Sequence, residues 1–234
     1  MASKDFFANK RGRPSQRKSG EKIPKPNSFL IVSEGTKTEP FYFEGLANFV
    51  NSKYGNSIDV EKPTITPLGE GKSTVNLVNE TRKIAARGKI LYNQVWIVFD
   101  KDEFTDFDKA ISMAEDLGYR VAWNNQSFEY WIFLHFHYSD AAINRDDWEA
   151  KISDIFKKKK INPKGYHKND PNVFTIATTN GSLSDAVKRA IKIESTYPKG
   201  TLPSRCDPCT KVHHLILELA PFIEELLLSR PECN

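Results

Sequence analysis

Acidic residues stand at the ends of two short apolar runs in this sequence. Glu34 directly follows the run at 28–33. Asp100 and Asp102 stand at the end of a second run, at 94–100. Ligands of open parallel α/β sheets bind at the carboxyl ends of the strands, so two such strands would bring these carboxylates to a binding edge. Because side chains alternate along a strand, we expect Asp100 and Asp102 to face the same side.

Carboxylates gathered at such an edge favour a hard divalent cation. They raise one another's pKa values unless a positive charge neutralises them. Mg²⁺, or Mn²⁺ in its place, takes one or two carboxylates together with waters and substrate phosphates. Such an ion polarises a phosphoryl group and activates water, which is the chemistry of phosphodiester hydrolysis. A D-x-D pair alone is a weak signal, because many such pairs are solvated loop charges.

Alternating strands and helices would position these carboxylates. Apolar and β-branched runs predict strands at 28–33, within 58–68, at 94–100 and at 119–123. Two prolines place the second run at a sheet edge, whereas the third is apolar on both faces and belongs at the centre. Helical spacing predicts helices that begin at Thr38, as N-cap, and at Phe128, with others ending near Arg87 and Leu117. We therefore expect an α/β fold with a mostly parallel sheet flanked by helices.

The chain divides into three regions by composition. Residues 1–26 are rich in Lys, Arg, Pro, Ser and Gly, which predicts a basic disordered tail. Residues 1–25 carry a net charge of +6, whereas the whole chain carries +4, so the rest is slightly acidic. The tail is suited to contact phosphates, or else it only keeps the protein soluble. Residues 27–140 would form the α/β core, and 141–234, with helical spacing, a helical C-terminal region packed on it.

Cysteine usage and hydropathy indicate the compartment. The three cysteines cannot form a paired disulfide framework, which fits a reducing cytoplasm. The first residues lack the apolar segment of a signal peptide, and no run is long enough to span a membrane. We expect a soluble cytoplasmic protein with no membrane partner.

Several segments resemble the RloB-like family, which includes abortive-infection proteins of the AbiLii type. SFLIVSEGTKTEPFYFEGL is similar to the opening motif of that family, VWIVFDKDEF to its D-x-D segment, and VAWNNQSFEYWIFLHF to its F-E-x-W segment. GYHKND and DPCTKVHHLILEL resemble two later elements. The resemblance extends over about 28–219, and the chain departs from it at Asn124, where the family has Ser, and at Asp207, where it has Asn.

The resemblance implies a Toprim-like fold, shared with topoisomerases, primases and OLD-type nucleases. In that fold Glu34 would be a general acid or base or a metal ligand, and Asp100 and Asp102 would be Mg²⁺ ligands. Glu39 resembles the second acidic residue of the OLD-type variant, which implies a ligand for a second metal. Lys37 would neutralise charge in the transition state.

Glu129 is a further candidate ligand, because it begins a helix whose preceding strand should end at the same edge. The alternative for this residue is a favourable interaction with the helix dipole. His135 lies in the L-H-F part of the resemblance and is a candidate for the site. A histidine in so apolar a segment is, however, more often a hydrogen-bonded core residue. Lys168, with Tyr166, is a candidate phosphate contact.

The segment GEGKS at 69–73 is not a Walker A loop, because Thr66 stands where that motif needs glycine. Lys72 and Ser73, with backbone N–H groups at a helix start, are still candidates for holding a substrate phosphate, the alternative being a plain helix cap. Cys206 and Cys209, followed by two histidines, resemble half of a zinc site, but no second pair exists. Incidental cysteines are the better interpretation.

The sequence thus favours a Mg²⁺-dependent nuclease that hydrolyses RNA or DNA as an effector of bacterial anti-phage, abortive-infection defence. Families of this kind often work beside a separate ATPase, and the missing Walker A loop fits that arrangement. The alternative is a non-catalytic binding or regulatory module of an ATPase-containing defence complex. A topoisomerase or primase would need further domains. Assembly as a homo-oligomer is left open.

Overall fold

The computed structural model describes residues 23–24, 28–35, 37–55, 58–61, 74–88, 90–101 and 105–228. Three of the predicted site residues, Lys72, Ser73 and Asp102, lie outside the described residues, as does nearly all of the predicted basic tail. The predictions for these residues therefore stay predictions.

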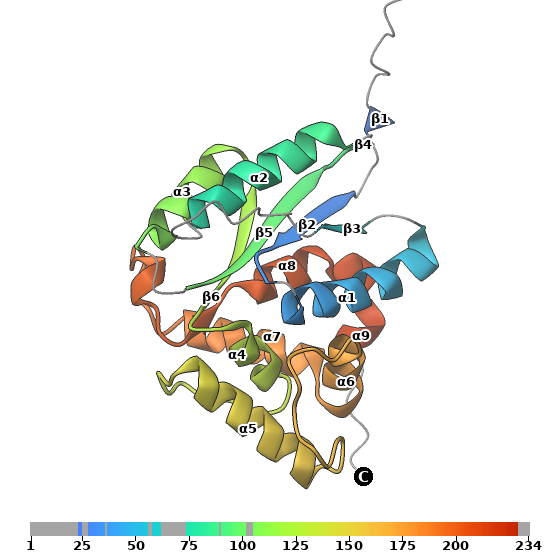
Figure 1. Ribbon diagram of the computed structural model, residues 1–234, viewed down its shortest axis with the longest axis vertical. Coiled ribbons are helices and arrows are strands. Elements are labelled where there is room, and N and C mark those ends of the chain that lie inside the picture. The colour runs from blue at the N-terminus through green and yellow to red at the C-terminus, as the bar shows by residue number, and fades with distance from the viewer. Residues whose placement is uncertain are drawn as a thin grey trace, which may run out of the picture.

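A five-stranded sheet forms the centre of the molecule (Figure 1). Its order is β3 (Ile58–Glu61), β2 (Phe29–Ser33), β5 (Gln94–Lys101), β6 (Arg120–Asn125) and β7 (Cys209–Thr210). The first four strands are parallel, and β7 runs antiparallel to β6. β5 is central and β3 lies at an edge, as their sequences predict. A separate parallel pair joins β1 (Ile23–Pro24) to β4 (Ile90–Leu91).

Helices cover both faces of this sheet. On one face lie α2 (Thr74–Arg87) and α3 (Phe107–Asp116), and on the other lie α1 (Thr38–Tyr54), α4 (Phe128–Leu134) and α8 (Val212–Glu218) (Figure 1). Along β2, Phe29 and Ile31 enter the larger hydrophobic core under α1, whereas Leu30 and Val32 enter the smaller core under α2. Burial on both faces explains why the strand sequences are continuously apolar. The prediction of a mixed α/β fold with a mostly parallel sheet is confirmed.

The segment after residue 141 supplies helices and also one strand. Its helices are α5 (Arg145–Lys158), α6 (Val173–Asn180), α7 (Leu183–Glu194), α8 and α9 (Glu224–Leu228), with short 3₁₀ turns at Pro203–Arg205 and Ala220–Phe222. The strand β7 returns to the central sheet beside β6. A strand of two residues has no periodicity, so the sequence did not predict it. None of the helices in the described residues combines the length and the apolar character needed to cross a membrane.

The aromatic helix α4 is shorter than its apolar sequence suggests. It ends at Leu134, because tertiary partners take the carbonyl groups that a longer helix would use. The Leu134 carbonyl accepts a hydrogen bond from Arg189 Nη1 at 2.7 Å, and the His135 carbonyl accepts one from the Ser182 N–H at 2.9 Å. Both donors come from the region of α7, so the end of α4 is set by packing rather than by local sequence.

Candidate acidic metal centre

Asp100 lies at the carboxyl end of the central strand β5. It follows Trp96 and Val98 at alternate positions, and these two side chains face the core under α1 and α4. Its carboxylate is held from two sides. Oδ1 accepts a hydrogen bond from Asn124 Nδ2 at 2.9 Å, and Oδ2 accepts one from the Phe128 N–H at 3.1 Å. The neighbouring strand and the first turn of α4 thus fix the position of this group.

Two further carboxylates approach Asp100 from helices. Glu39 lies in the first turn of α1 and Glu129 in the first turn of α4, and both helices cover the face that Asp100 enters. The Glu39 side chain also packs against the loop after β2. A Cβ atom at Gly35 would lie 1.9 Å from Glu39 Oε2, so any side chain at that position would displace the Glu39 carboxylate.

The electrostatics of this acidic centre favour a cation. Surrounding protein raises the pKa of Asp100 well above its usual value, and the charges of Glu39 and Glu129 raise it further. Hydrogen bonds from Asn124 and Phe128 lower the pKa but do not offset these effects. A divalent cation would lower the pKa of Asp100 instead, because it favours the ionised carboxylates. The donors are all oxygen atoms, which is the ligand set that Mg²⁺ and Mn²⁺ prefer, so the chemistry of these residues fits such an ion. Their oxygen atoms do not form a group of three within 4.8 Å of one another, so an ion would draw the carboxylates closer together.

A tyrosine and a lysine hold Glu129 in place. Glu129 is only 3% exposed, and its Oε1 accepts a hydrogen bond from the Tyr166 hydroxyl at 3.2 Å. Lys168 Nζ lies 3.9 Å from the same oxygen and 2.5 Å from Glu149 Oε1. Burial lowers the pKa of Lys168, but its hydrogen bond to Glu149 and the charges of Glu129 and Glu149 outweigh burial, so this pKa lies above its usual value. Lys168 is therefore charged and partly exposed beside the acidic centre.

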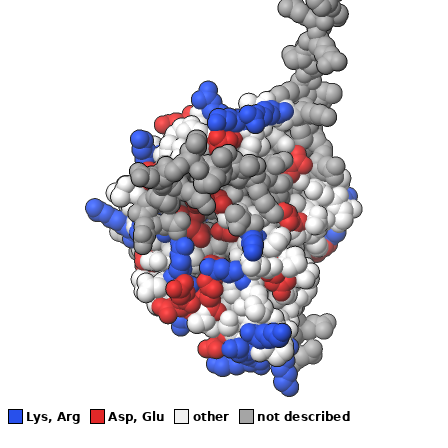
Figure 2. All heavy atoms as spheres, in the orientation of Figure 1, with Lys and Arg blue, Asp and Glu red and all other residues white. Residues whose placement is uncertain are grey.

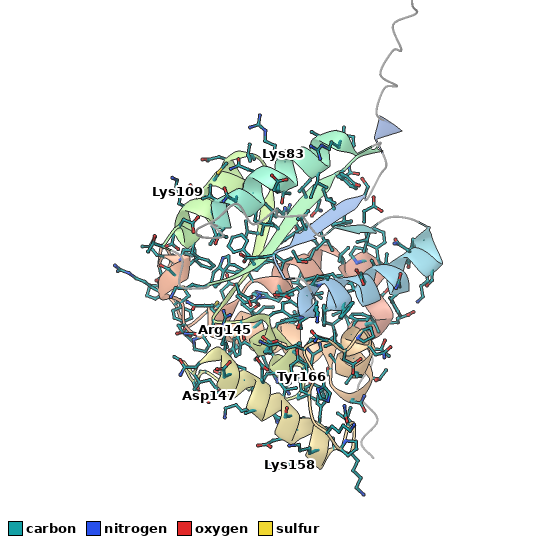
Figure 3. The ribbon with its side chains drawn as sticks, in the orientation of Figure 1. Lys83, Lys109, Arg145, Asp147, Lys158 and Tyr166 are labelled. Carbon is teal, nitrogen blue, oxygen red and sulfur yellow. The ribbon has the colours of Figure 1, made fainter. Side chains whose placement is uncertain are left out.

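Arg145 adds a second cation at the start of α5 (Figure 3). Its Nη2 donates a hydrogen bond at 2.9 Å to the carbonyl of Gln126, in the loop that joins β6 to α4. Gln126 has a φ of 84°, and its own amide donates to Asp207 Oδ2 at 2.9 Å. Arg145 also lies close enough to Lys168 to oppose its protonation. The two cations come from different elements, which is why spacing in the sequence did not reveal the pair.

Glu34 and Lys37 lie on the loop between β2 and α1. The Glu34 N–H donates to the Val98 carbonyl at 2.9 Å, so its backbone lies beside β5 just before Asp100. Glu34 is half-buried and Lys37 is exposed. The sequence predicted Thr38 as the N-cap, and this is wrong. Lys37 is the N-cap residue, and the Thr38 hydroxyl donates at 2.8 Å to the carbonyl of Lys168, which ties the loop after α5 to the start of α1.

His135 lies in the hydrophobic core and is 1% exposed. Its Nδ1 lies 3.1 Å from the Trp131 carbonyl, so Nδ1 carries the proton and Nε2 accepts from the Tyr42 hydroxyl, also at 3.1 Å. Burial lowers the pKa of His135 to about 4, so the ring is neutral at pH 7. Both nitrogens are used within the core, which corrects the prediction of a substrate contact. A hydrogen-bonded core histidine, the alternative for this residue, is what the structure contains.

Tyr42→Phe should lower the free energy of unfolding by about 1–3 kcal/mol. The variant keeps the aromatic ring but leaves His135 Nε2 as a buried acceptor without its donor. Urea denaturation of both proteins measures the difference. Tyr54→Phe, at the exposed end of the same helix, is the matched control and should stay within about 0.5 kcal/mol of the wild type. Equal stability of Tyr42→Phe and the wild type would contradict this account of His135.

Asn124 and Thr210 are site residues to which the sequence analysis gave no role. Thr210 Oγ1 donates to Asn124 Oδ1 at 2.6 Å, and Asn124 in turn donates to Asp100. The threonine reaches the site because β7 pairs with β6, in the register Asn124 to Thr210. Both residues lie in the segments that resemble the family, and this was the one signal that pointed to them.

Comparison with known families places most of the chain in one of them. The model of a family described as RloB-like protein matches residues 29–219. That range contains every residue of the acidic centre. No curated protein and no solved structure matches the chain.

Proposed function

This chain belongs to the RloB-like family, and we propose that it is a metal-dependent nuclease that hydrolyses phosphodiester bonds of RNA or DNA. Membership of this family suggests a defence-related protein, and the proposal makes the chain an effector of anti-phage, abortive-infection defence in the cytoplasm. The observation that carries the nuclease is the environment of Asp100. Asp100 lies at the carboxyl end of the central strand, where Glu39 and Glu129 approach it from the first turns of α1 and α4. These two charges and the surrounding protein raise its pKa, an arrangement that a bound cation would relieve.

The carboxylates of the acidic centre are the proposed metal ligands. Asp100, Glu39 and Glu129 provide oxygen atoms for Mg²⁺ or Mn²⁺, together with Glu34 from the loop after β2 and with Asp102, which lies outside the described residues. A bound ion of this kind polarises the phosphoryl group and lowers the pKa of a water molecule.

Two cations and a tyrosine complete the proposed site. Lys168 and Arg145 contact the non-bridging oxygens of the substrate phosphate and balance the charge that develops on them. Tyr166 keeps Glu129 in place by its hydrogen bond. Burial and the charge of Glu129 raise the pKa of this tyrosine well above its usual value, so its hydroxyl stays protonated and donates.

Basic side chains away from the centre support a nucleic acid as substrate. Lys157, Lys158, Lys159 and Lys160 are all exposed at the C-terminal end of α5. Figure 2 shows Lys and Arg side chains gathered there, at the lower end of the molecule, where Figure 3 labels Lys158. A long polyanion could contact this end of α5 and the acidic centre at once, whereas a solvated helix end is the alternative for the lysines alone.

A cleavage assay tests the proposal directly. Purified chain is incubated with mixed tRNA, single-stranded RNA and DNA, each with Mg²⁺, Mn²⁺ or EDTA. Cleavage that requires the metal is the expected result, and the substrate that is cut names the class. If none is cut, the assay is repeated with a separate ATPase added as the proposed partner, because the chain has no Walker A loop. Absence of metal-dependent cleavage in both assays would contradict the nuclease and favour a binding module.

Deletion of residues 1–25 should weaken the affinity for nucleic acid and flatten its dependence on salt. The deleted segment carries a net charge of +6, so its lysines and arginines displace counterions from the phosphates. The slope of log K against log salt should become shallower by about 0.7–0.9 for each phosphate that the tail neutralises in the full chain. Fluorescence anisotropy at several salt concentrations measures this slope, and an identical slope in both proteins would mean that the tail does not touch the nucleic acid.

A further inference from the structure

Two histidines and a glutamate converge where α7 ends and α8 begins. Glu194 is the last residue of α7, and His213 and His214 lie in the first turn of α8. The Nε2 atoms of both histidines lie 2.8 Å from the same carboxylate oxygen, Glu194 Oε2. Among the described residues, this is the group of His, Cys, Asp or Glu side chains whose three ligand atoms all lie within 4.8 Å of one another.

The orientation of His213 leaves a lone pair facing that carboxylate. Nδ1 of His213 lies 3.0 Å from the Thr210 carbonyl, which can only accept, so Nδ1 carries a proton. In the neutral ring Nε2 is then an acceptor, and it faces a second acceptor, Glu194 Oε2. Because two acceptors repel each other, a positive charge is needed between His213 Nε2 and Glu194 Oε2. A second proton on His213 would supply it, but that would place a positive charge on a ring that is only 1% exposed, with the His214 ring centroid 4.3 Å away.

We propose that Glu194, His213 and His214 bind a Zn²⁺ ion, as a second metal site distinct from the acidic centre. One divalent ion would accept lone pairs from all three side chains at once. Two imidazoles and one carboxylate are a zinc-type donor set, whereas Mg²⁺ prefers oxygen atoms alone. Bonds of about 2.0–2.1 Å in a tetrahedral site require ligand atoms about 3.3 Å apart. Small shifts of the half-exposed Glu194 and the exposed His214 would provide that spacing.

The surroundings of the three ligands are those of a prepared site. The Thr210 carbonyl fixes the tautomer and orientation of His213, as outer partners of ligating histidines do. Lys211 Nζ pairs with the other oxygen, Glu194 Oε1, and so orients the carboxylate. The positive charge of Lys211 also opposes a cation, and this gives the proposal a second test.

The site opens into a pocket of about 710 Å³ that all three ligands line. Three protein ligands leave the fourth position of a tetrahedral ion free, which is the pattern of an open site rather than a closed structural one. The pocket has the volume of a small-molecule site, with Trp123 and Leu217 among its apolar walls. Lys199 and Lys211 are the lysines that line it, and Glu115 is a further carboxylate in the wall. A small anion is therefore the ligand class that fits the free position.

Cys206 and Cys209 line the same pocket but do not belong to the group of three. Burial raises the pKa of the Cys209 thiol to about 12, so the sulfur stays protonated. The sequence placed the histidines beside these cysteines as half of a zinc site. It could not identify Glu194, which precedes His213 by 19 residues and reaches it only because α7 packs against α8.

Zinc binding to the full chain tests the proposal. After treatment with a chelator, the protein is titrated with Zn²⁺ in competition with a chromophoric chelator. One Zn²⁺ ion should bind to the proposed site of each chain. His214→Ala should weaken the affinity by at least about tenfold, since even outer partners of metal ligands are worth 10–100-fold. His214 is 47% exposed in its side chain, so the fold should not depend on it. His167→Ala, at another exposed histidine, is the matched control and should bind as the wild type does.

Further variants separate this site from the alternatives. Lys211→Met should bind Zn²⁺ more tightly, because it removes a positive charge, and Glu194→Gln should bind it more weakly. The double replacement of Cys206 and Cys209 by serine should leave the affinity unchanged, and so should Asp100→Asn, whatever its effect on cleavage. No zinc uptake, equal affinity in His214→Ala and the wild type, or loss of binding in the serine variant alone would each overturn the proposal.

Discussion

Asp100→Asn should cleave nucleic acid at least about 1000-fold more slowly than the wild type. The asparagine keeps the shape of the side chain and one oxygen that can accept from the Phe128 N–H. It removes the negative charge that Asp100 contributes to the metal centre. Loss of a metal ligand costs several kcal/mol of transition-state stabilisation, and about 4 kcal/mol corresponds to this factor. Initial rates with saturating Mg²⁺ or Mn²⁺ measure the effect.

Asp116→Asn is the matched control for this experiment. Asp116 is exposed at the end of α3, on the opposite face of the sheet, so the same chemical change should leave the rate unchanged. Circular dichroism and gel filtration establish that both variants are folded. A rate in Asp100→Asn equal to that of the wild type would remove Asp100 from the site of cleavage. Nucleic-acid binding without cleavage in the wild type would instead favour the non-catalytic module.

The strands and the placement of Asp100 could be predicted because local sequence and global fold agree there. Burial on both faces makes β2 and β5 continuously apolar, and the acidic residue marks where the central strand leaves the core. Glu129 also follows from sequence, since it lies in the first turn of a helix that comes directly after a strand, whereas Glu39 was expected from the family resemblance alone. In a parallel sheet, the carboxyl ends of the strands and the first turns of the helices that follow them lie at the same edge. The topology itself therefore brings these side chains together.

The partners that hold these carboxylates could not be predicted, because they come from distant parts of the chain. Thr210 reaches Asn124 across 86 residues through a strand of two residues, and Lys168 lies near Glu129 through an irregular loop. No periodic pattern encodes such contacts. For His135 the sequence predicted a site residue that the fold does not provide. Its neighbours in sequence resemble a site motif, but packing places its ring in the core.

The helix that contains His213 illustrates a third kind of limit. The sequence shows a histidine pair near two cysteines, which resembles half of a zinc site, and incidental cysteines were the better interpretation because no second pair exists. In the fold the carboxylate of Glu194 approaches the pair instead, and the Thr210 carbonyl accepts a hydrogen bond from His213 Nδ1. Thr210 therefore contacts both sites, by its hydroxyl toward Asn124 and by its carbonyl toward His213. The place of this threonine in the family motif is explained by its role in positioning Asn124 and His213, and not by a chemical step of the threonine itself.

In the absence of metal, the stability of the wild-type protein relative to Asp100→Asn should fall as the pH rises. The pKa of Asp100 is raised in the folded protein, by the surrounding protein first and then by Glu39 and Glu129. In the unfolded chain an aspartate ionises near pH 4. Above that pH the folded protein binds one more proton than the unfolded chain, so its free energy of unfolding decreases with pH, by at most about 1.4 kcal/mol per pH unit, until the folded carboxyl also ionises.

Asp100→Asn has no proton to lose at this position, so the difference between the two proteins reports the titration of Asp100 together with its electrostatic coupling to Glu39 and Glu129. Urea denaturation from pH 4 to 8 in EDTA measures it, and two parallel curves would contradict the raised pKa. Mg²⁺ should act in the opposite direction. Because its ligands must be deprotonated, it should stabilise the wild type more at pH 8 than at pH 5, and stabilise Asp100→Asn little at either pH. A carboxylate cluster that only paired with Lys168 and Arg145 would show no such response to the metal, so the same titration distinguishes a metal centre from a network of ion pairs.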